Sequence, residues 1–186
     1  MGGSHSQLTH EELDDYTSLT YLTKKEVLHA FKRFKGVSYS VVDKDKTARL
    51  PIPYIANMPE FCNNPFKDRL LKVFSSKKDG RLSFEDFLDL VSILSENAPT
   101  DVKLECAFQI YDFDEDGALG EEDLEQVLHR LTSVEGLKLQ PDDIERLIAN
   151  ILNEADLDRS GNLSSMEFQH CMLKNPDFAS SFRIRL

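Results

Sequence analysis

The sequence predicts an all-α fold built from four helix–loop–helix units in two pairs, and three observations support this prediction. Apolar residues recur at helical spacing in successive segments, for example within residues 84–91 and 124–131, whereas the alternation typical of strands is almost absent. Gly80, Gly117 and Gly161 follow one another at intervals of 37 and 44 residues, each in a polar loop between two amphipathic segments. The length of 186 residues accommodates four such units in two small lobes.

The N-terminal segment, residues 1–22, is expected to carry an extra helix and a lipid attachment signal. Residues 9–12 read Thr-His-Glu-Glu, which is the pattern of a capping box at a helix start. The chain opens with Met-Gly-Gly-Ser-His-Ser, which fits an N-myristoylation signal with Gly2 as the acceptor. A single acyl chain binds a membrane only marginally, so we expect peripheral attachment that needs a second signal.

The remaining chain divides into three predicted parts. Residues 23–98 form an N-terminal lobe, residues 99–174 form a C-terminal lobe, and residues 175–186 form an apolar tail. The joint between the lobes is expected at the Asn-Ala-Pro-Thr-Asp stretch around Pro99, because proline and polar residues interrupt the helical pattern there.

The formal net charge of −11 is concentrated in the second half of the chain. Residues 1–100 hold fourteen acidic and fourteen basic residues, whereas residues 101–170 hold eighteen acidic and five basic ones. A chain without clustered bases is a poor candidate for a nucleic-acid-binding protein. Any function that needs negative charge is therefore expected in the C-terminal lobe.

Residues 112–123 concentrate acidic side chains in a pattern that suits calcium. Calcium takes oxygen ligands, and a twelve-residue loop supplies them from positions 1, 3, 5, 7, 9 and 12 when a glycine at position 6 permits a sharp turn. The run Asp-Phe-Asp-Glu-Asp-Gly-Ala-Leu-Gly-Glu-Glu-Asp meets these requirements. The predicted ligands are the side chains of Asp112, Asp114, Asp116 and Asp123 and the carbonyl oxygen of Ala118.

Residues 156–167 repeat this pattern as Asp-Leu-Asp-Arg-Ser-Gly-Asn-Leu-Ser-Ser-Met-Glu. Leu119 and Leu163 both fall at position 8, where paired loops would meet in a short antiparallel bridge. Two matched loops in tandem indicate a pair of EF-hands with two calcium sites. The predicted ligands of the second loop are Asp156, Asp158, Ser160, Ser164 and Glu167, together with the carbonyl oxygen of Asn162.

The two loops differ at position 12. Glu167 can reach an ion with both carboxylate oxygens, whereas Asp123 is one methylene shorter. Magnesium requires a compact octahedral shell and keeps water ligands, so a loop with fewer protein oxygens suits it. We expect the 112–123 loop to hold Mg²⁺ at rest and either ion when calcium rises. The 156–167 loop is expected to be the more selective for Ca²⁺.

The two loops of the N-terminal lobe lack a complete ligand set. In the loop 75–86, aligned on Gly80, Lys77 stands at position 3, where a cation site needs an oxygen. In the loop 43–54, Tyr54 stands at position 12 in place of an acid. We expect neither loop to bind calcium and their helices to persist as packing units.

Paired EF-hands present an apolar groove when they open, and we expect a helix of a partner protein to bind there. The apolar tail either fills this groove until a partner displaces it or packs permanently as core, and the sequence leaves both alternatives open. The tail side chains expected to pack on the protein are Phe178, Phe182, Ile184 and Leu186. The residues expected to line the groove are Val91, Leu94, Leu128, Leu131, Leu147, Ile148, Ile151, Phe168 and Met172.

No enzyme is predicted. The histidines at positions 5, 10, 29, 129 and 170 are scattered, and no nucleophile–base pair, phosphate loop or zinc-ligand spacing occurs. Cys62, Cys106 and Cys171 are expected to be free thiols, as in a reducing compartment. Because no apolar run approaches membrane-spanning length and no secretory signal is present, we expect a cytosolic protein.

Several long stretches carry a resemblance to a known family. They are the opening MGGS, then LTYLTKKEVL, NPFKDRLLKVFSS, LSFEDFLDLVSILSE, AFQIYDFDEDG and EFQH, and the closing NPDFASSFRIRL. With these stretches the chain resembles the calcium- and integrin-binding protein family over nearly its whole length. Asp123 and Glu167 match the residues of that family at position 12 of the third and fourth hands, whereas residues 36–55 depart from the expected pattern.

This resemblance implies a small Ca²⁺- and Mg²⁺-binding adaptor, myristoylated at Gly2, that is cytoplasmic with peripheral plasma-membrane association and could also reach the nucleus. Its partners would be membrane-proximal helices, such as integrin α-subunit cytoplasmic tails, and protein kinases. We expect a monomer or a weak dimer. Two other functions stay open: a passive calcium buffer, and a regulatory subunit of an enzyme or channel, as in calcineurin B or a mechanotransduction channel.

Overall fold

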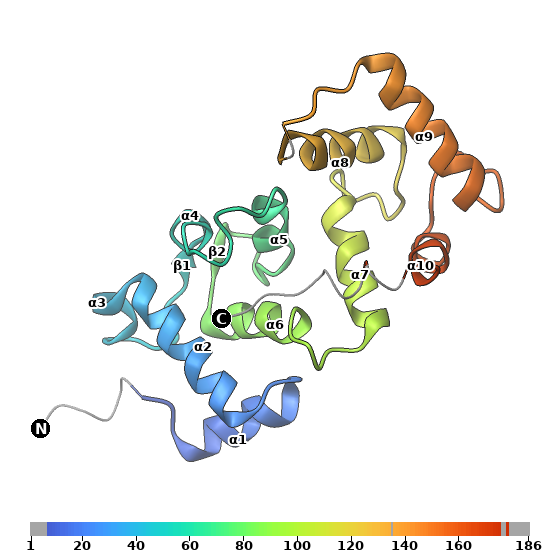
Figure 1. Cartoon of the computed structure of the whole chain (residues 1–186). Coiled ribbons are helices and arrows are strands. Elements are labelled where there is room, and N and C mark those ends of the chain that lie inside the picture. Colours follow the sequence, from blue (N-terminus) through green and yellow to red (C-terminus); the bar gives the residue numbers. More distant parts are fainter. Residues whose placement is uncertain (1–6, 135, 176–177, 179–186) are drawn as a thin grey trace, which may run out of the picture. The chain divides into compact units, whose positions relative to one another are not determined.

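The computed structural model describes residues 7–134, 136–175 and 178, and it confirms the predicted all-α fold (Figure 1). The chain divides between Pro99 and Thr100 into two compact units, which we call unit 1 and unit 2. Among the described residues, no helix combines the length and the apolarity that crossing a bilayer requires. Gly2 and the tail residues Phe182, Ile184 and Leu186 lie outside this description.

Unit 1 combines six helices with one small antiparallel ladder, counted over its described residues 7–99. Leu50 pairs with Leu82 in this ladder, and both leucines fall at position 8 of their loops. The two loops of unit 1 therefore meet as EF-hand loops do, although their ligand sets are incomplete. The elements are α1 (His10–Leu19), α2 (Lys24–Val37), α3 (Tyr39–Val42), β1 (Leu50–Pro51), α4 (Ile52–Ala56), α5 (Lys67–Val73), β2 (Arg81–Leu82) and α6 (Phe84–Ile93).

The predicted extra helix is α1, and it begins with the predicted capping box. The Thr9 N–H donates to Glu12 Oε2 at 2.8 Å, and the Glu12 N–H donates to Thr9 Oγ1 at 3.2 Å. This reciprocal pair satisfies two of the donors that a helix start leaves without intrahelical partners. On the same helix, the Tyr16 hydroxyl donates to Glu85 Oε1 at 2.8 Å, which joins α1 to the first turn of α6.

Phenylalanine dominates the core of unit 1. The ring of Phe84 lies 4.9 Å from that of Phe31 and 5.8 Å from that of Phe34, measured between centroids. The ring of Phe87 lies 5.5 Å from Phe34 and 6.4 Å from Phe61. Such edge-to-face and tilted pairs are worth about 0.5–1.5 kcal/mol each beyond the area that they bury. They fix α6 against α2 directly behind the loop 75–86.

A cavity of about 820 Å³ lies beside this core, between the start of α2 and the end of α6. Its lining is mixed, with Leu28 and Val91 supplying apolar surface and Lys32 and Glu96 supplying charge. The shape of this cavity therefore depends on how α6 is held against α2.

Unit 2 contains four described helices and a single bridge between its loops. Leu119 and Leu163 form this antiparallel bridge, with N–H···O distances of 2.8 and 2.9 Å in the two directions, as the sequence predicts. The third helix of the unit begins at Pro141, where the fixed φ of proline suits the first helical turn. The helices are α7 (Thr100–Tyr111), α8 (Glu121–Val134), α9 (Pro141–Ala155) and α10 (Ser165–Leu173).

The core of unit 2 gathers apolar residues from both of its loops and all four helices. The two bridge leucines are part of it, at 1 % and 3 % exposure, so the bridge fixes the loops and fills the core at once. Phe178, at the start of the tail, packs on Phe168 with the ring centroids 6.3 Å apart. The buried members are Ala107, Phe108, Leu119, Leu124, Ile144, Ile148, Ala155, Leu163 and Phe168.

All three cysteines are free thiols, as predicted. Cys106 is buried in α7, and burial raises the pKa of its thiol to about 12. The thiol is therefore neutral at physiological pH and packs as a small apolar group.

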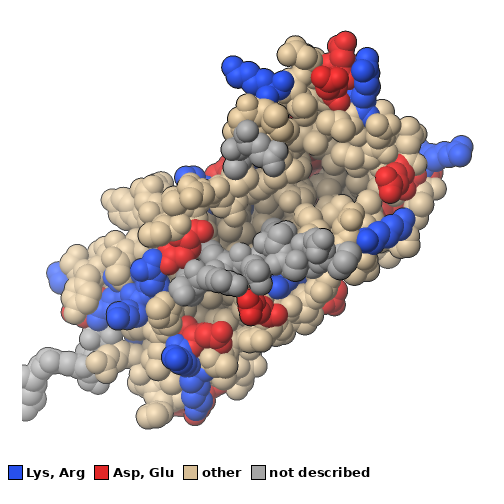
Figure 2. Space-filling view, viewed as in Figure 1, with Lys and Arg blue, Asp and Glu red and all other residues tan. Residues whose placement is uncertain are grey.

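Charged side chains of both signs are interspersed on the face drawn in Figure 2. Among the described residues of that face, basic and acidic side chains occur in small groups next to one another. A broad basic surface of the kind that binds nucleic acid is not visible there.

Replacing Phe87 with alanine should lower the free energy of unfolding of unit 1 by about 3–5 kcal/mol, because the ring is completely buried and leaves a cavity. Tyr54 offers a matched control in the same unit, since its side chain is 58 % exposed and Tyr54→Ala should change stability by no more than about 0.5 kcal/mol. Urea unfolding of the full chain, followed by circular dichroism without divalent ions, measures both. Equal losses in the two variants would contradict this packing.

Candidate functional site

Three of the four loops share one backbone signature. Position 4 and position 6 both adopt positive φ in the loops 75–86, 112–123 and 156–167. Glycine at position 6 adopts this left-handed region without the strain that a side chain adds. The loop 75–86 therefore keeps the EF-hand turn although it lacks the ligand set. The values are 49° at Lys78, 63° at Glu115 and 61° at Arg159, followed by 71° at Gly80, 89° at Gly117 and 85° at Gly161.

In the loop 112–123, the predicted carboxylates converge. Asp112, Asp114 and Asp116 each place an oxygen within 4.8 Å of the others. Asp112 Oδ2 accepts from the Gly117 N–H at 3.0 Å, and Asp116 Oδ1 accepts from the Ala118 N–H at 2.8 Å. Burial raises the pKa of Asp112, and the neighbouring charge of Asp123 adds to this effect. A cation among these oxygens would offset the cost of keeping them ionised.

Asp123 closes the same loop from position 12. Its side chain is buried, Oδ1 accepts from the Phe113 N–H at 2.8 Å, and Oδ2 accepts from the Gly120 N–H at 3.1 Å. Both of its oxygens are thus engaged with backbone donors at the two ends of the loop. Asp123 is not a member of the group of carboxylates whose oxygens lie within 4.8 Å of one another.

In the loop 156–167, the residue at position 12 belongs to the converging group. Asp156, Asp158 and Glu167 each place an oxygen within 4.8 Å of the others. Glu167 Oε1 accepts from the Leu157 N–H at 2.8 Å, and Oε2 accepts from the Ser164 hydroxyl at 2.7 Å and its N–H at 2.9 Å. These hydrogen bonds, led by the one from the Ser164 hydroxyl, lower the pKa of Glu167 to about 2, so the carboxylate is ionised.

The neutral predicted ligands lie between these carboxylates. The Ser160 hydroxyl at position 5 donates to the Asn162 carbonyl oxygen at position 7, with 3.0 Å between the oxygens. Ser164 at position 9 is the N-cap of α10. Ala118 at position 7 of the other loop directly precedes the bridge residue Leu119. Each loop thus offers hard oxygen donors, which suit Ca²⁺ and Mg²⁺ rather than softer metals.

Sequence reasoning missed the role of Gly120, at position 9 of the loop 112–123. A Cβ atom added there would lie 3.1 Å from Asn162 Oδ1 in the partner loop and 3.8 Å from Asp123 Oδ2. A side chain at position 9 would therefore crowd the Asn162 side chain, and glycine avoids this contact. The signal was present in the sequence, because a second glycine follows the one at position 6 in this loop alone. As a consequence, position 9 offers no side-chain oxygen there.

The residues predicted to line a partner groove are distributed over both units. Val91 and Leu94 are buried within unit 1. Of the seven in unit 2, Ile148 and Phe168 are buried core residues, and Leu131 and Leu147 are 45 % and 39 % exposed. The groove itself stays a prediction. The remaining three, Leu128, Ile151 and Met172, are partly buried against the core of unit 2.

Comparison with known proteins identifies the family to which the chain is related. Residues 101–173, which contain both acidic loops, match the family model of an EF-hand domain pair. Calcium and integrin-binding family member 2 of Drosophila melanogaster is 42% identical over 192 residues, which cover all of both chains.

Two vertebrate relatives also cover their whole length and all of this chain. Calcium and integrin-binding family member 2 of Danio rerio is 39% identical over 190 residues, and family member 3 of Homo sapiens is 38% identical over 190 residues. From the pattern of its two ends we expect the chain to be similar to the founding member of this family, and this assignment stays a prediction. The chain belongs to the calcium and integrin-binding protein family, and its EF-hand pair makes it a calcium-binding regulatory protein.

Proposed function

We propose that the protein is a calcium-dependent adaptor that takes up two divalent ions in unit 2 and then binds an amphipathic helix of a partner protein. The observation that carries this proposal is the pairing of two converging carboxylate groups through the Leu119–Leu163 bridge. Because the bridge joins the loops by two hydrogen bonds, an ion in one loop restrains the other, which favours coupled uptake.

The proposed ligands follow from the loop geometry. When bound, each ion supplies the positive charge that the acidic loops otherwise lack. The 156–167 loop would hold Ca²⁺ with Asp156, Asp158, Ser160, Ser164, Glu167 and the Asn162 carbonyl. The 112–123 loop would hold Mg²⁺ or Ca²⁺ with Asp112, Asp114, Asp116, Asp123 and the Ala118 carbonyl.

The proposed difference in ion preference between the two loops depends on the residues at positions 9 and 12. Asp123 binds two backbone N–H groups and lies outside the converging group, whereas Glu167 lies inside it. Position 9 is Gly120 in one loop and Ser164 in the other, so the first loop lacks a side-chain oxygen at this position. Fewer protein oxygens leave places for water, which Mg²⁺ retains more readily than Ca²⁺.

Coupling of ion uptake to helix movement distinguishes a sensor from a passive buffer. Asp123 lies in the first turn of α8, and Glu167 lies in the first turn of α10. A shift of these carboxylates toward an ion would therefore pull on the start of a core helix. The side chains of Leu131 and Leu147, on α8 and α9, offer exposed apolar surface that a partner helix could cover.

The proposed partners are protein helices near a membrane. The names of the relatives refer to integrin binding, so we propose the cytoplasmic tail of an integrin α-subunit as the first partner class. Protein kinases are the second, on the family resemblance. We further propose that Gly2 carries a myristoyl group and that the protein associates peripherally with the plasma membrane.

Calorimetric titration with a synthetic integrin α-tail peptide should show at least about tenfold tighter binding in calcium than in EDTA, because ion uptake and partner binding are coupled. Glu167→Gln should remove this gain. Met166→Gln is the matched control, since the adjacent side chain is 81 % exposed and should leave the gain intact. If the full chain binds the peptide equally well with and without ions, a calcium-dependent adaptor is excluded. A passive calcium buffer or a constitutive regulatory subunit would then remain.

The same titration distinguishes the two alternatives for the apolar tail, a displaceable occupant of the groove and a permanent part of the core. If the tail occupies the groove, removal of residues 177–186 should tighten peptide binding while Ca²⁺ binding to unit 2 stays unchanged. If the tail is permanent core, the truncated chain should instead lose stability without a gain in peptide affinity.

Exchanging the residues at position 12 should exchange the ion preference. Asp123→Glu should raise the Ca²⁺/Mg²⁺ affinity ratio of the first loop by roughly tenfold, because the longer side chain adds a second oxygen. Glu167→Asp should lower the ratio of the second loop by a similar factor. Titration followed by NMR at the Gly117 and Gly161 amides measures the loops separately. An unchanged ratio in both variants would refute the assignment of magnesium to the 112–123 loop.

A further inference from the structure

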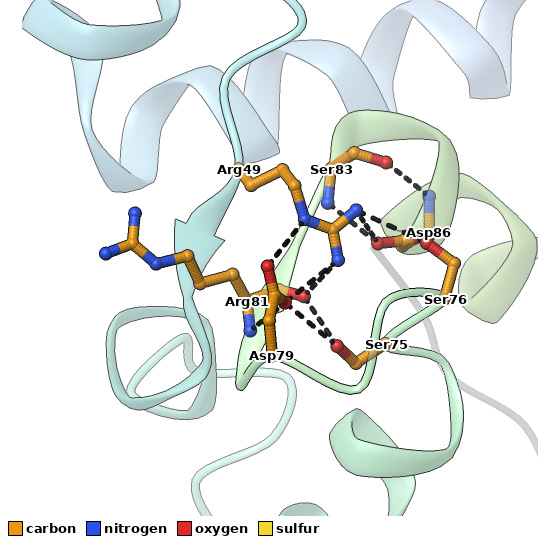
Figure 3. A network of polar contacts seen from close by, with 7 residues as sticks. All are labelled: Arg49, Ser75, Ser76, Asp79, Arg81, Ser83 and Asp86. Carbon is orange, nitrogen blue, oxygen red and sulfur yellow. Dashed lines mark hydrogen bonds and ion pairs between the residues drawn. The ribbon is translucent and has the colours of Figure 1, made fainter.

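An arginine lies among the ligand positions of the loop 75–86. The guanidinium of Arg49 donates from Nη2 to Asp79 Oδ1 at 3.1 Å and from Nε to Asp79 Oδ2 at 3.3 Å (Figure 3). Nη2 also donates to the Arg81 carbonyl oxygen at 2.8 Å. Nη1 lies 3.0 Å from Asp86 Oδ2 and donates to Ser76 Oγ at 3.3 Å. One cationic group thus contacts two carboxylates, a carbonyl and a hydroxyl of the same loop.

Three of the four residues that Arg49 contacts stand at positions that a metal ion would use. Asp79, Arg81 and Asp86 stand at positions 5, 7 and 12 of the loop, which bind calcium through side chain, carbonyl and side chain. The Ser75 hydroxyl at position 1 is also turned inward and donates to the Arg81 carbonyl oxygen at 2.7 Å. The turn is intact, with positive φ at positions 4 and 6 as in the loops of unit 2.

The ladder between the two loops explains how Arg49 reaches this place. Arg49 directly precedes Leu50, which pairs with Leu82. Because neighbouring residues of a strand point to opposite faces, burial of Leu50 in the core directs Arg49 to the side of the ligand positions. The side chain of Arg81, across the ladder, points away from the cluster (Figure 3).

Low exposure and hydrogen bonding favour the contacts between Arg49 and the two carboxylates. The side chain of Arg49 is 14 % exposed and that of Asp86 is 7 % exposed, so this ion pair is largely shielded from water. Hydrogen bonding to Arg49 holds the pKa of Asp79 below its usual value. Burying a carboxylate is costly unless it is hydrogen-bonded or paired with a cation, and Asp86 has Arg49 as its cationic partner.

We propose that Arg49 is a built-in cation of the loop 75–86, which takes the place of a metal ion and holds the loops of unit 1 closed at every calcium concentration. Asp86 also caps α6, where the Ser83 N–H donates to its Oδ2 at 2.9 Å. The guanidinium therefore fixes the start of α6, the helix that lines the cavity of unit 1 at its other end. Unit 1 keeps one conformation while unit 2 responds to ions.

Hydrogen–deuterium exchange of the full chain in EDTA tests the closure. Arg49→Gln should raise the exchange rate of the β2 and early α6 amides by at least about tenfold, because Asp86 then lacks its charged partner. Arg81→Gln is the matched control, since it removes the same charge from a side chain outside the cluster and keeps the backbone carbonyl inside it. It should leave these rates unchanged. Arg49→Lys should fall between the two, because an ammonium keeps the charge but not the planar fork.

A competition experiment tests whether Arg49 occupies the place of an ion rather than merely packing there. Ser75→Asp with Lys77→Asp restores acids at positions 1 and 3 of the loop. With Arg49 retained, the Gly80 amide should show no NMR response to Ca²⁺; with Arg49→Ala added, it should show a saturable one. The proposal is overturned if the Gly80 response does not depend on residue 49, or if Arg49→Gln leaves the exchange around β2 unchanged. Neither readout depends on the ions or partners proposed for unit 2.

Discussion

Both units depend on the contact between two leucines at position 8 of paired loops. In unit 2, Leu119 and Leu163 exchange two backbone hydrogen bonds, and in unit 1 Leu50 and Leu82 occupy the corresponding places in a ladder of two-residue strands. All four side chains are almost completely buried. The contact therefore joins neighbouring loops and anchors them in the core at the same time. Without it, each helix–loop–helix unit would have to bury its apolar face alone.

The paired loops hold carboxylates at closely spaced positions, and these carboxylates need a source of positive charge. Unit 2 supplies backbone N–H donors to Asp112, Asp123 and Glu167, which orient the carboxylates but leave most of their charge uncompensated. Unit 1 supplies Arg49 from the neighbouring loop. In the proposed assignments, an exchangeable divalent ion supplies the positive charge in unit 2, and the Arg49 side chain supplies it in unit 1.

The sequence predicted the fold and the loops because both are encoded locally. Helical periodicity, the capping box at Thr9 and the glycine at position 6 depend on residues within one or two turns of each other. The bridge of unit 2 followed from equal loop positions. Arg49 could not be found in this way, because its role depends on the register of two strands and on acids thirty or more residues away. The second glycine of the 112–123 loop, Gly120, is visible in the sequence, but its contact with Asn162 of the partner loop is not.

The charge distribution along the chain follows from this difference between the units. Residues 1–100 hold equal numbers of acidic and basic residues, whereas residues 101–170 hold eighteen acidic and only five basic ones. Self-repulsion therefore opposes the compact state of unit 2 until divalent ions neutralise part of it, and salt screens the remainder. Unit 1 carries no such excess, and the shielded pair between Arg49 and Asp86 is less sensitive to screening than exposed charges are. In the proposed assignment, a change in calcium acts on the folding energy of unit 2, which would let this unit signal while unit 1 keeps its shape.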